Sequence, residues 1–534
     1  MGARRRWLDC VALGWLLLLL AFHAAFAARA LGRALDYDEA QHLHVAWLLS
    51  RGLRPFRDFQ ETHLPILAEL LRLLQPSATT REMPLLDVTT FASRARVLAS
   101  IAGTAGIVGA ACVAMQVTRT LSSAATAATF IVASHWLWMR GVADVRPEPI
   151  ASAGLWLGAA LMVQLPRSTV RGALRLGLAA ALPVAGFLVN PKSPVVLTVL
   201  GGWFAWGVAT ISRPDRRLVL LACAPPVLTL AVGVAALLRV SSLGDLLLQV
   251  VRVNAANAEW VRQATFLDDR VSTPLFYRPP ASWGVAPVLA FVGLVYVVAI
   301  PRTRLRERRG VLFVALLMAA AFVELRWLYP FPRLWPQYFL TWGFSLAVAF
   351  GCAPQLVAGS GGAGVGEVRP FRALAEVASV LGAGALLAAH ASEVPVPGKA
   401  DAYRWEAVSF LQRNLRPGEP VWIRADFHPI GAPDASYYWT SFADVVPSTM
   451  RYASSVGDAR LHPAIGDAEL PFCRVLEGQD GDLRFISYDW EDFRNLPSTR
   501  RCLAALRQGN RLCPTPYPPL FYLRPSDGAC EVGR

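Results

Sequence analysis

The chain has 534 residues, of which 54% are hydrophobic and only 17% are charged. Soluble globular proteins carry roughly 25% charged residues. Apolar runs close to the ~20 residues needed to cross a bilayer recur along the first 390 positions. A soluble chain would have to bury all of these runs in one core, so the composition excludes a soluble protein and indicates a polytopic membrane protein.

The net charge of +14 is unevenly distributed. Residues 1–400 carry 37 basic and 21 acidic side chains, or +16, whereas the remainder carries 15 Arg against 17 acidic side chains, or −2. The basic residues lie in short loops between apolar runs, where they act as orientation signals. We therefore predict no nucleic-acid partner. Lys192 and Lys399 are the only lysines, and the bias towards Arg, Ala, Gly and Leu is typical of a GC-rich bacterial genome.

The first apolar run follows Arg4, Arg5 and Arg6, so we predict a cytoplasmic N-terminus. The same run also resembles a cleavable signal peptide, which is the alternative. Predicted spans lie at about 8–29, 94–117, 121–140, 149–166, 172–189, 194–212, 217–239, 283–300, 310–329, 335–357 and 371–390. Eleven crossings of the cytoplasmic membrane place the C-terminus outside, and the Arg-rich loops then fall on the cytoplasmic side, as the positive-inside tendency requires.

The composition predicts two domains, a transmembrane domain over residues 1–398 and a soluble extracytoplasmic α/β domain over 399–534. The second domain is expected to begin with a helix at about 401–415, followed by a strand in "PVWIRA". Its four cysteines indicate two disulfides in an oxidising compartment. A zinc site is the rival interpretation, but no C-x2-C pair is present. The four candidates are Cys473, Cys502, Cys513 and Cys530.

The stretch "ALDYDEAQHLHVAWLLSRGLRPFRDFQETHLP", residues 34–65, contains five acidic side chains and three histidines and is predicted to face outside. Asp36 can cap a helix, and Glu39 three residues later fits a capping box. We expect an amphipathic helix at about 37–51 on the outer membrane surface, stopping at Gly52. Helical spacing places Asp38 and His42 on one face. Glu39 could serve the cap alone, whereas a carboxylate beside a membrane pocket is costly unless it is paired or used.

Three further outward loops contain "RGVADVRPEP", "NPKSP" and "LRWLYPFPRLWPQYFL". Cations near an interface can simply reach lipid phosphates. Their presence on the outer side, however, runs against the positive-inside tendency. We therefore expect an outer-face site for an anionic, phosphate-bearing lipid with acid–base groups nearby. The polar side chains that these loops contribute include Arg146, Glu148, Lys192, Arg333, Gln337 and Tyr338.

The order of motifs along the chain resembles the GT-C class of membrane glycosyltransferases. These motifs are the first span, the acidic stretch continuing to "HLPIL", and then "RPEPIAS", "NPKSPVVL" and "PQYFLTWGFSLAVAF". The resemblance is specifically to the protein O-mannosyltransferase and aminoarabinose-transferase superfamily, and it covers residues 1 to about 350. It implies an all-α GT-C-like membrane domain. It also implies an inverting transfer of a sugar from a polyprenyl-phosphate carrier to a lipid, polysaccharide or protein acceptor on the outer face.

The resemblance also implies roles for individual residues. Asp38, with Glu39 beside it, matches the general base on the acceptor hydroxyl. Lys192, Arg333 and Arg146 are the candidates that stabilise the departing lipid phosphate. The pattern departs from the family at Leu64, which stands where the family has a proline, and this puts the role of His63 in doubt. Supporting roles are expected for His42, Asp58, His63, Glu148, Gln337 and Tyr338.

Some relatives use a divalent metal, which here would be Mg²⁺ or Mn²⁺ on hard oxygen ligands. The candidates are Asp38, Glu39, Asp58 and Glu61, although their spacing has no diagnostic pattern. The alternative function is a non-enzymatic flippase or transporter of a lipid-linked sugar. A transporter is expected to have ionisable residues near the bilayer midplane. The predicted span interiors are almost free of charge, which favours the enzyme.

Overall fold

The computed structural model describes residues 2–59, 61, 63–76, 85–164, 168–211, 215–253, 255, 305–325, 340–359, 398–435, 483–487, 504–505, 508, 512–518 and 520–523. They fall into two compact units. Unit 1 takes its described residues from 1–30, 96–235 and 264–395, and unit 2 takes them from 31–95, 236–263 and 396–534. Residues 31–95 thus group with residues 396–534, whereas the sequence-based division placed them in the N-terminal domain.

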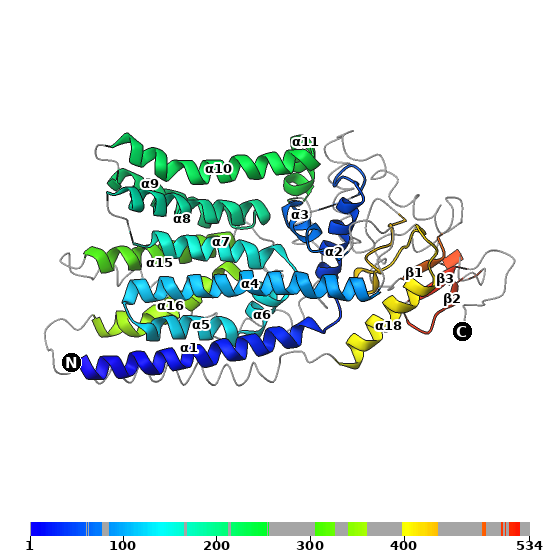
Figure 1. The fold of residues 1–534 in the computed structure, drawn as a ribbon, viewed down its shortest axis with the longest axis horizontal. Helices are drawn as coiled ribbons and strands as arrows, with labels where there is room; N and C mark the ends of the chain where they lie inside the picture. Colours follow the sequence, from blue (N-terminus) through cyan, green and yellow to red (C-terminus); the bar gives the residue numbers. More distant parts are fainter. Residues whose placement is uncertain are drawn as a thin grey trace. The chain divides into compact units, whose positions relative to one another are not determined.

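Unit 1 is a helical bundle whose long helices run roughly parallel to one another (Figure 1). Neighbours along the chain pack together, as α7 does with α8 and α8 with α9, and distant helices also meet, as α5 does with α16 and α9 with α15. The helices that lie wholly or mostly in unit 1 are α1 (Gly2–Leu31), α4 (Leu85–Thr118), α5 (Leu121–Ala133), α6 (His135–Trp138), η1 (Met139–Ala143), α7 (Pro147–Met162), α8 (Val170–Val189), α9 (Pro194–Ile211), α10 (Arg216–Val240), α15 (Leu305–Val323) and α16 (Leu340–Gly359).

Five of the described helices are long and apolar enough to cross a membrane, namely segments of α1, α4, α8, α9 and α10. Three shorter apolar helices lie at 121–133, 309–323 and 340–352. The expected single span at 121–140 is instead broken after α5, because the backbone of Ser134 is extended and its hydroxyl donates to the Phe130 carbonyl at 2.7 Å. The expected spans at 283–300 and 371–390 lie outside the described residues.

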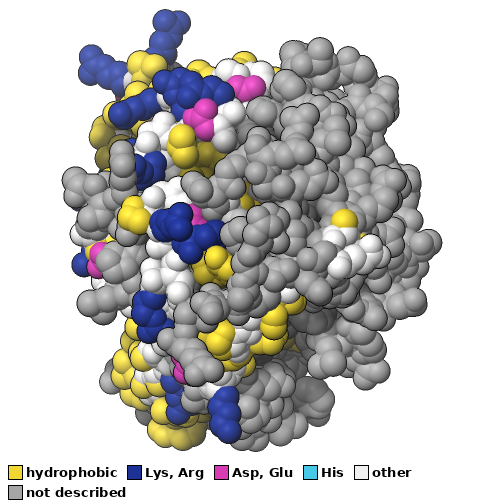
Figure 2. All heavy atoms as spheres, turned by 90° about the vertical axis from the view of Figure 1, so that its right-hand side faces the viewer, with side chains coloured by type: hydrophobic (Ala, Val, Ile, Leu, Met, Phe, Trp, Pro, Cys, Tyr) yellow, Lys and Arg dark blue, Asp and Glu magenta, His cyan; other side chains and the backbone are white. Residues whose placement is uncertain are grey.

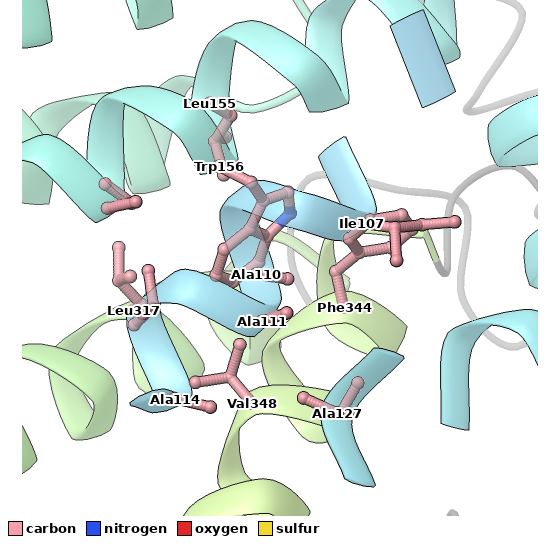
Figure 3. Close-up of a cluster of buried hydrophobic side chains, with 14 of the residues drawn as sticks. Ile107, Ala110, Ala111, Ala114, Ala127, Leu155, Trp156, Leu317, Phe344 and Val348 are labelled. Atoms are coloured by element: carbon pink, nitrogen blue, oxygen red, sulfur yellow. The ribbon is translucent and has the colours of Figure 1, made fainter. Parts of the chain in front are cut away.

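The core of the bundle combines large aromatic side chains with alanine-rich helix faces. Trp156 of α7 stacks on Phe344 of α16, with ring centroids 6.0 Å apart, and Figure 3 shows α4 presenting alanines to this pair. Inside a bilayer the hydrophobic effect does not hold helices together, so close van der Waals packing must do so. Small side chains allow this packing because they let the helix axes approach closely. The labelled side chains of this cluster are Ile107, Ala110, Ala111, Ala114, Ala127, Leu155, Trp156, Leu317, Phe344 and Val348.

The closest approach of α7 to α8 depends on glycines. A Cβ atom at Gly154 would lie 2.4 Å from the Leu182 carbonyl oxygen, and one at Gly158 would lie 2.5 Å from the ring of Pro183. These two glycines are four residues apart on α7 and form a small-xxx-small face. This contact fixes the third and fourth turns of α7, the helix whose first turn carries Glu148.

Unit 2 combines helices, turns and a small sheet. Its helices are α2 (Tyr37–Ser50), α3 (Ile66–Arg72), α11 (Leu243–Asp245), η2 (Leu246–Val253), α18 (Lys399–Asn414) and η7 (Ala425–Phe427). Strands β1 (Phe485–Ser487), β3 (Leu520–Leu523) and β2 (Leu512–Pro514) form an antiparallel sheet in that order. The apolar face of α18 packs on this sheet through Phe410, whose ring lies 6.1 Å from that of Phe485.

The helix predicted at 401–415 is found as α18. The prediction of a strand in "PVWIRA" is wrong, because Val421 and Trp422 form only isolated β-bridges, to Asp434 and Ile486. Cys513 is disulfide-bonded. Cys10, Cys112, Cys223 and Cys352 are free thiols, and Cys473, Cys502 and Cys530 lie outside the described residues.

Helix α2 begins and ends as the sequence predicts. The Asp36 side chain accepts from the Glu39 backbone N–H at 2.8 Å, and the Glu39 carboxylate accepts from the Asp36 N–H at 3.1 Å, which completes the capping box. Gly52 follows the helix with φ of +80°, a conformation that glycine adopts without strain. The prediction that this helix is amphipathic and lies on the membrane surface is wrong, however, because residues 39–49 are buried on every side of α2.

Candidate functional site

A pocket in unit 1 combines an apolar wall with a polar end. Its described lining is Glu148, Ala151, Ser152, Leu155, Trp156, Pro183, Gly186, Phe187, Asn190, Lys192, Ser193, Leu197, Leu340 and Thr341. The aromatic and aliphatic side chains come from α7, α8, α9 and α16, whereas Asn190, Lys192 and Ser193 come from the α8–α9 turn. An apolar lining with a few convergent polar groups is the usual composition of a ligand site.

The polar end of this pocket is an ion-pair chain. The Nζ atom of Lys192 lies 2.8 Å from Oε1 of Glu148, and Nε of Arg146 lies 3.5 Å from Oε2 of the same carboxylate. Arg146 and Glu148 are buried, whereas the Lys192 side chain is 26% exposed. Glu148 thus faces two cations, and the group as a whole carries one net positive charge. Lys192 is the member of this group that remains accessible to a ligand.

Local backbone structure explains why these residues meet. Pro147 starts α7, which places Arg146 at the cap and Glu148 in the first turn. The α8–α9 turn is fixed by Glu324, whose Oε1 accepts from the Val196 N–H at 2.8 Å, and by the 2.9 Å hydrogen bond between the Ser193 and Thr341 hydroxyls. Just before this site, Asp144 accepts from Arg140 at 2.7 Å across the π-helical turn η1. Such π-helical turns are frequent at functional sites.

In unit 2, Asp38 and Glu39 occupy the first turn of α2 in different environments. Glu39 is fully buried, and its two carboxylate oxygens accept from Arg33 Nη2 at 2.9 Å and from the Asp36 N–H. Asp38 is half-buried. The contacts of Glu39 fix the start of the helix, and Asp38 is the more accessible of the two carboxylates.

The face of α2 that carries Asp38 also carries Gln41 and His42, and these two side chains contact the "ETHLP" segment. Gln41 Nε2 donates to Glu61 at 3.2 Å, and the rings of His42 and His63 lie edge to face at 4.9 Å. Glu61 also accepts from the backbone N–H of His63 at 2.8 Å and from its ring Nδ1 at 2.9 Å. His63 is therefore placed with His42 and Glu61 despite Leu64.

The carboxyl group of Glu61 is buried, and burial raises its pKa. Hydrogen bonds from His63 and the charges of His63 and His42 outweigh this effect, so the pKa of Glu61 lies below its usual value. Asp58 has contacts in its own turn instead, accepting from the Arg54 N–H at 2.7 Å and from Arg57 Nε at 2.8 Å. The Arg57 side chain in this pair is 63% exposed.

These contacts bear on the expected Mg²⁺ or Mn²⁺ ligands. Glu39 is paired with Arg33, Asp58 with Arg57, and Glu61 with His63 and Gln41. A hard cation would have to compete with a proton donor or cation at each of the three carboxylates. The donor sets do not fit a shared oxygen-only site, and we assign no reaction step to a metal there.

Unit 2 contains a third polar cluster that the sequence did not single out. His44 Nε2 lies 2.8 Å from Oδ2 of Asp434, and His428 Nε2 lies 3.4 Å from Oδ1. Burial and the neighbouring His44 lower the pKa of His428 to about 4. Burial opposes ionisation of Asp434, but His44 and His428 hold its pKa at about 2. Only the tertiary fold joins His44 to Asp434, which lies 390 positions later.

Arg333, Gln337, Tyr338, Cys473, Cys502 and Cys530 lie outside the described residues. Exposed Lys and Arg side chains on the face in Figure 2 are interspersed with single acidic ones.

The described site residues divide between the two units. Arg146, Glu148 and Lys192 lie in unit 1, and Asp38, Glu39, His42, Asp58, Glu61 and His63 lie in unit 2.

The described residues define a multi-pass α-helical membrane protein with a small sheet in its C-terminal part. No protein-family model and no curated protein matches the chain. Among solved structures, the crystal structure of ArnT from Cupriavidus metallidurans in the apo state matches with a TM-score of 0.46 and 15% sequence identity, over 91% of this chain and 95% of that chain.

Proposed function

We propose that the protein transfers a sugar from a polyprenyl-phosphate carrier to an acceptor hydroxyl on the outer face of the cytoplasmic membrane. The observation that carries this proposal is the unit 1 pocket, in which Lys192 meets an apolar wall containing Trp156 and Phe187. A polyprenyl phosphate has the same two features, an apolar chain and an anionic head group. A cation placed where charge develops on the departing phosphate is the kind of stabilisation that such a transfer needs.

Glu148 and Arg146 adjust the charge of this pocket. Paired only with Glu148, Lys192 would belong to a neutral ion pair with little attraction for an anion. Arg146, at 3.5 Å from the same carboxylate, supplies the second positive charge. The pocket then has two cations beside one carboxylate, and the ion pair with Glu148 fixes the Lys192 ammonium.

In the proposed reaction, Asp38 accepts the proton of the acceptor hydroxyl, and the acceptor oxygen attacks the anomeric carbon. The bond from that carbon to the phosphate oxygen breaks, and its electron pair leaves with the carrier phosphate, where Lys192 stabilises it. A single displacement of this kind inverts the anomeric carbon. A positioned base contributes roughly 10²–10⁴-fold, and one donor at a developing anion contributes roughly 10²–10³-fold.

Mass spectrometry of envelope glycans and glycolipids tests the proposal in strains that differ only in this protein. The deletion strain and the Asp38→Asn and Lys192→Met strains should lose one sugar increment and accumulate the polyprenyl-phosphate sugar. Lys399→Met is the matched control, because it removes the other lysine, which is exposed at the start of α18, and it should leave the glycans unchanged. Wild-type glycans in the Asp38→Asn strain would exclude Asp38 as the base.

Purified protein distinguishes the enzyme from a flippase or transporter. In detergent the two membrane faces no longer differ, so a transporter yields no covalent product. An enzyme forms product from a polyprenyl-phosphate sugar and an acceptor extract. Absence of product with wild-type protein, together with altered glycans in the deletion strain, would favour the transporter.

A further inference from the structure

We propose that His44, Asp434 and His428 form a site for a divalent transition metal of the zinc class, which joins α2 to the segment after α18. One potential ligand atom from each of the three side chains lies within 4.8 Å of the others. Both histidines are buried, and Asp434 is mostly buried. This cluster is separate from the carboxylates considered above for Mg²⁺ or Mn²⁺.

The hydrogen bonds of His44 provide the first argument. Its Nδ1 lies 2.6 Å from the carbonyl oxygen of Ile430, so this nitrogen carries the proton. A neutral His44 ring then presents the lone pair of Nε2 to Oδ2 of Asp434 at 2.8 Å. Two lone pairs at that distance require a cation between them, either a second proton on His44 or a metal ion.

The Nδ1 contact is also the one that metal-binding histidines usually make. Such a histidine donates its other ring N–H to a carbonyl or carboxylate, which fixes the tautomer and the ring orientation. Two imidazoles and one carboxylate form a donor set that suits Zn²⁺.

The backbone of Ile430 provides a second, independent argument. Ile430 has φ of +59°, an unfavourable conformation for a β-branched side chain. Its carbonyl contacts His44, and its N–H donates to His428 Nδ1 at 3.1 Å. A strained residue whose carbonyl orients the His44 imidazole is the pattern expected at a functional centre. Binding of a metal by His428 Nε2 requires the Ile430 N–H contact to break, so His44 and Asp434 are the primary ligands and His428 is the third.

The test measures Zn²⁺ bound to the purified full-length protein. The protein is stripped with a chelator, incubated with Zn²⁺ and separated from free metal before elemental analysis. Wild-type protein should retain about one Zn²⁺ per chain, and His44→Gln and Asp434→Asn should each lose it. Co²⁺ loading should give the visible absorption of a four-coordinate site in wild-type protein and not in these variants.

Two variants control for histidine content and for the backbone. His42→Gln removes another buried histidine of α2 and should retain the metal. Ile430→Gly relieves the backbone strain but keeps the carbonyl and the N–H, and it should also retain the metal. The proposal fails if wild-type protein holds no more Zn²⁺ than His44→Gln, which would leave a proton-only network. It fails equally if well-folded His44→Gln and Asp434→Asn both keep one Zn²⁺.

Discussion

Glu61 shows how a single buried carboxylate can make the stability of this protein depend on pH. Among the described residues, His63 donates to it twice and Gln41 once. With its pKa below the usual value in the folded chain, Glu61 contributes stability above its unfolded pKa of ~4.3. This contribution is lost as the pH falls through the lowered folded value.

We therefore expect the thermal midpoint of the purified protein to fall more steeply below about pH 5 in wild type than in Glu61→Gln. At pH 7 the variant should be the less stable of the two, because it loses the charge-assisted hydrogen bonds from His63. Intrinsic tryptophan fluorescence between pH 7 and pH 3.5 measures both effects. Glu69→Gln, which alters a half-buried pair with Arg72 on α3, should follow wild type. Equal slopes for Glu61→Gln and wild type would contradict this role of Glu61.

At the scale of the element, α7 connects the packing of the bundle to the pocket. Its first turn carries Glu148, and its third and fourth turns meet the backbone of α8 through Gly154 and Gly158. Any side chain added there must push α8 away, and with it the turn that carries Lys192.

A methyl group at Gly158 should therefore destabilise the bundle by about 1–3 kcal/mol, the usual cost of overpacking. The measurement compares the unfolding of Gly158→Ala with that of Gly201→Ala on α9. A Cβ atom at Gly201 meets nothing within 4 Å, so that change should be neutral or slightly stabilising through helix propensity. If both variants unfold alike, the close approach of α7 and α8 is not important for stability.

Local sequence signals predicted the elements well. The capping box of Asp36 and Glu39, the stop at Gly52 and the helix α18 all depend on neighbouring residues, and all are found. The break at Ser134 and the burial of α2 on every side were not predicted. Hydropathy reports how apolar a segment is but not whether its backbone leaves the helix, and burial of α2 depends on partners distant in sequence.

In the candidate site, too, local sequence signals predicted single residues but not the contacts between residues distant in sequence. Lys192 and Glu148 were predicted to lie in outward loops, and their pairing follows from the packing of α7 on α8. Asp434 could not be predicted, because nothing near it in the sequence marks it. His44 was visible in the histidine-rich stretch, but its partners lie 384 and 390 residues later.

At the scale of the whole molecule, the orientation in the membrane is a prediction from charge. We expect a reporter active only outside the cytoplasm, such as alkaline phosphatase, to be active when fused after residue 435. It should be inactive when fused after Ser168, in the loop that carries Arg167 and Arg171. The reverse pattern would invert the orientation and place the Asp38 segment on the cytoplasmic side.

The division of unit 2 along the chain has a consequence for biosynthesis. The hydrogen bond between His44 and Ile430 joins residues 386 positions apart. At about 5–20 residues per second, a ribosome needs roughly 20–80 s to make the intervening chain. During that interval α2 is synthesised, but the segment that contacts its buried His44 is not. Nascent α2, with nearly all of its surface destined for the interior, must therefore be sheltered by lipid or by a chaperone until translation is almost complete.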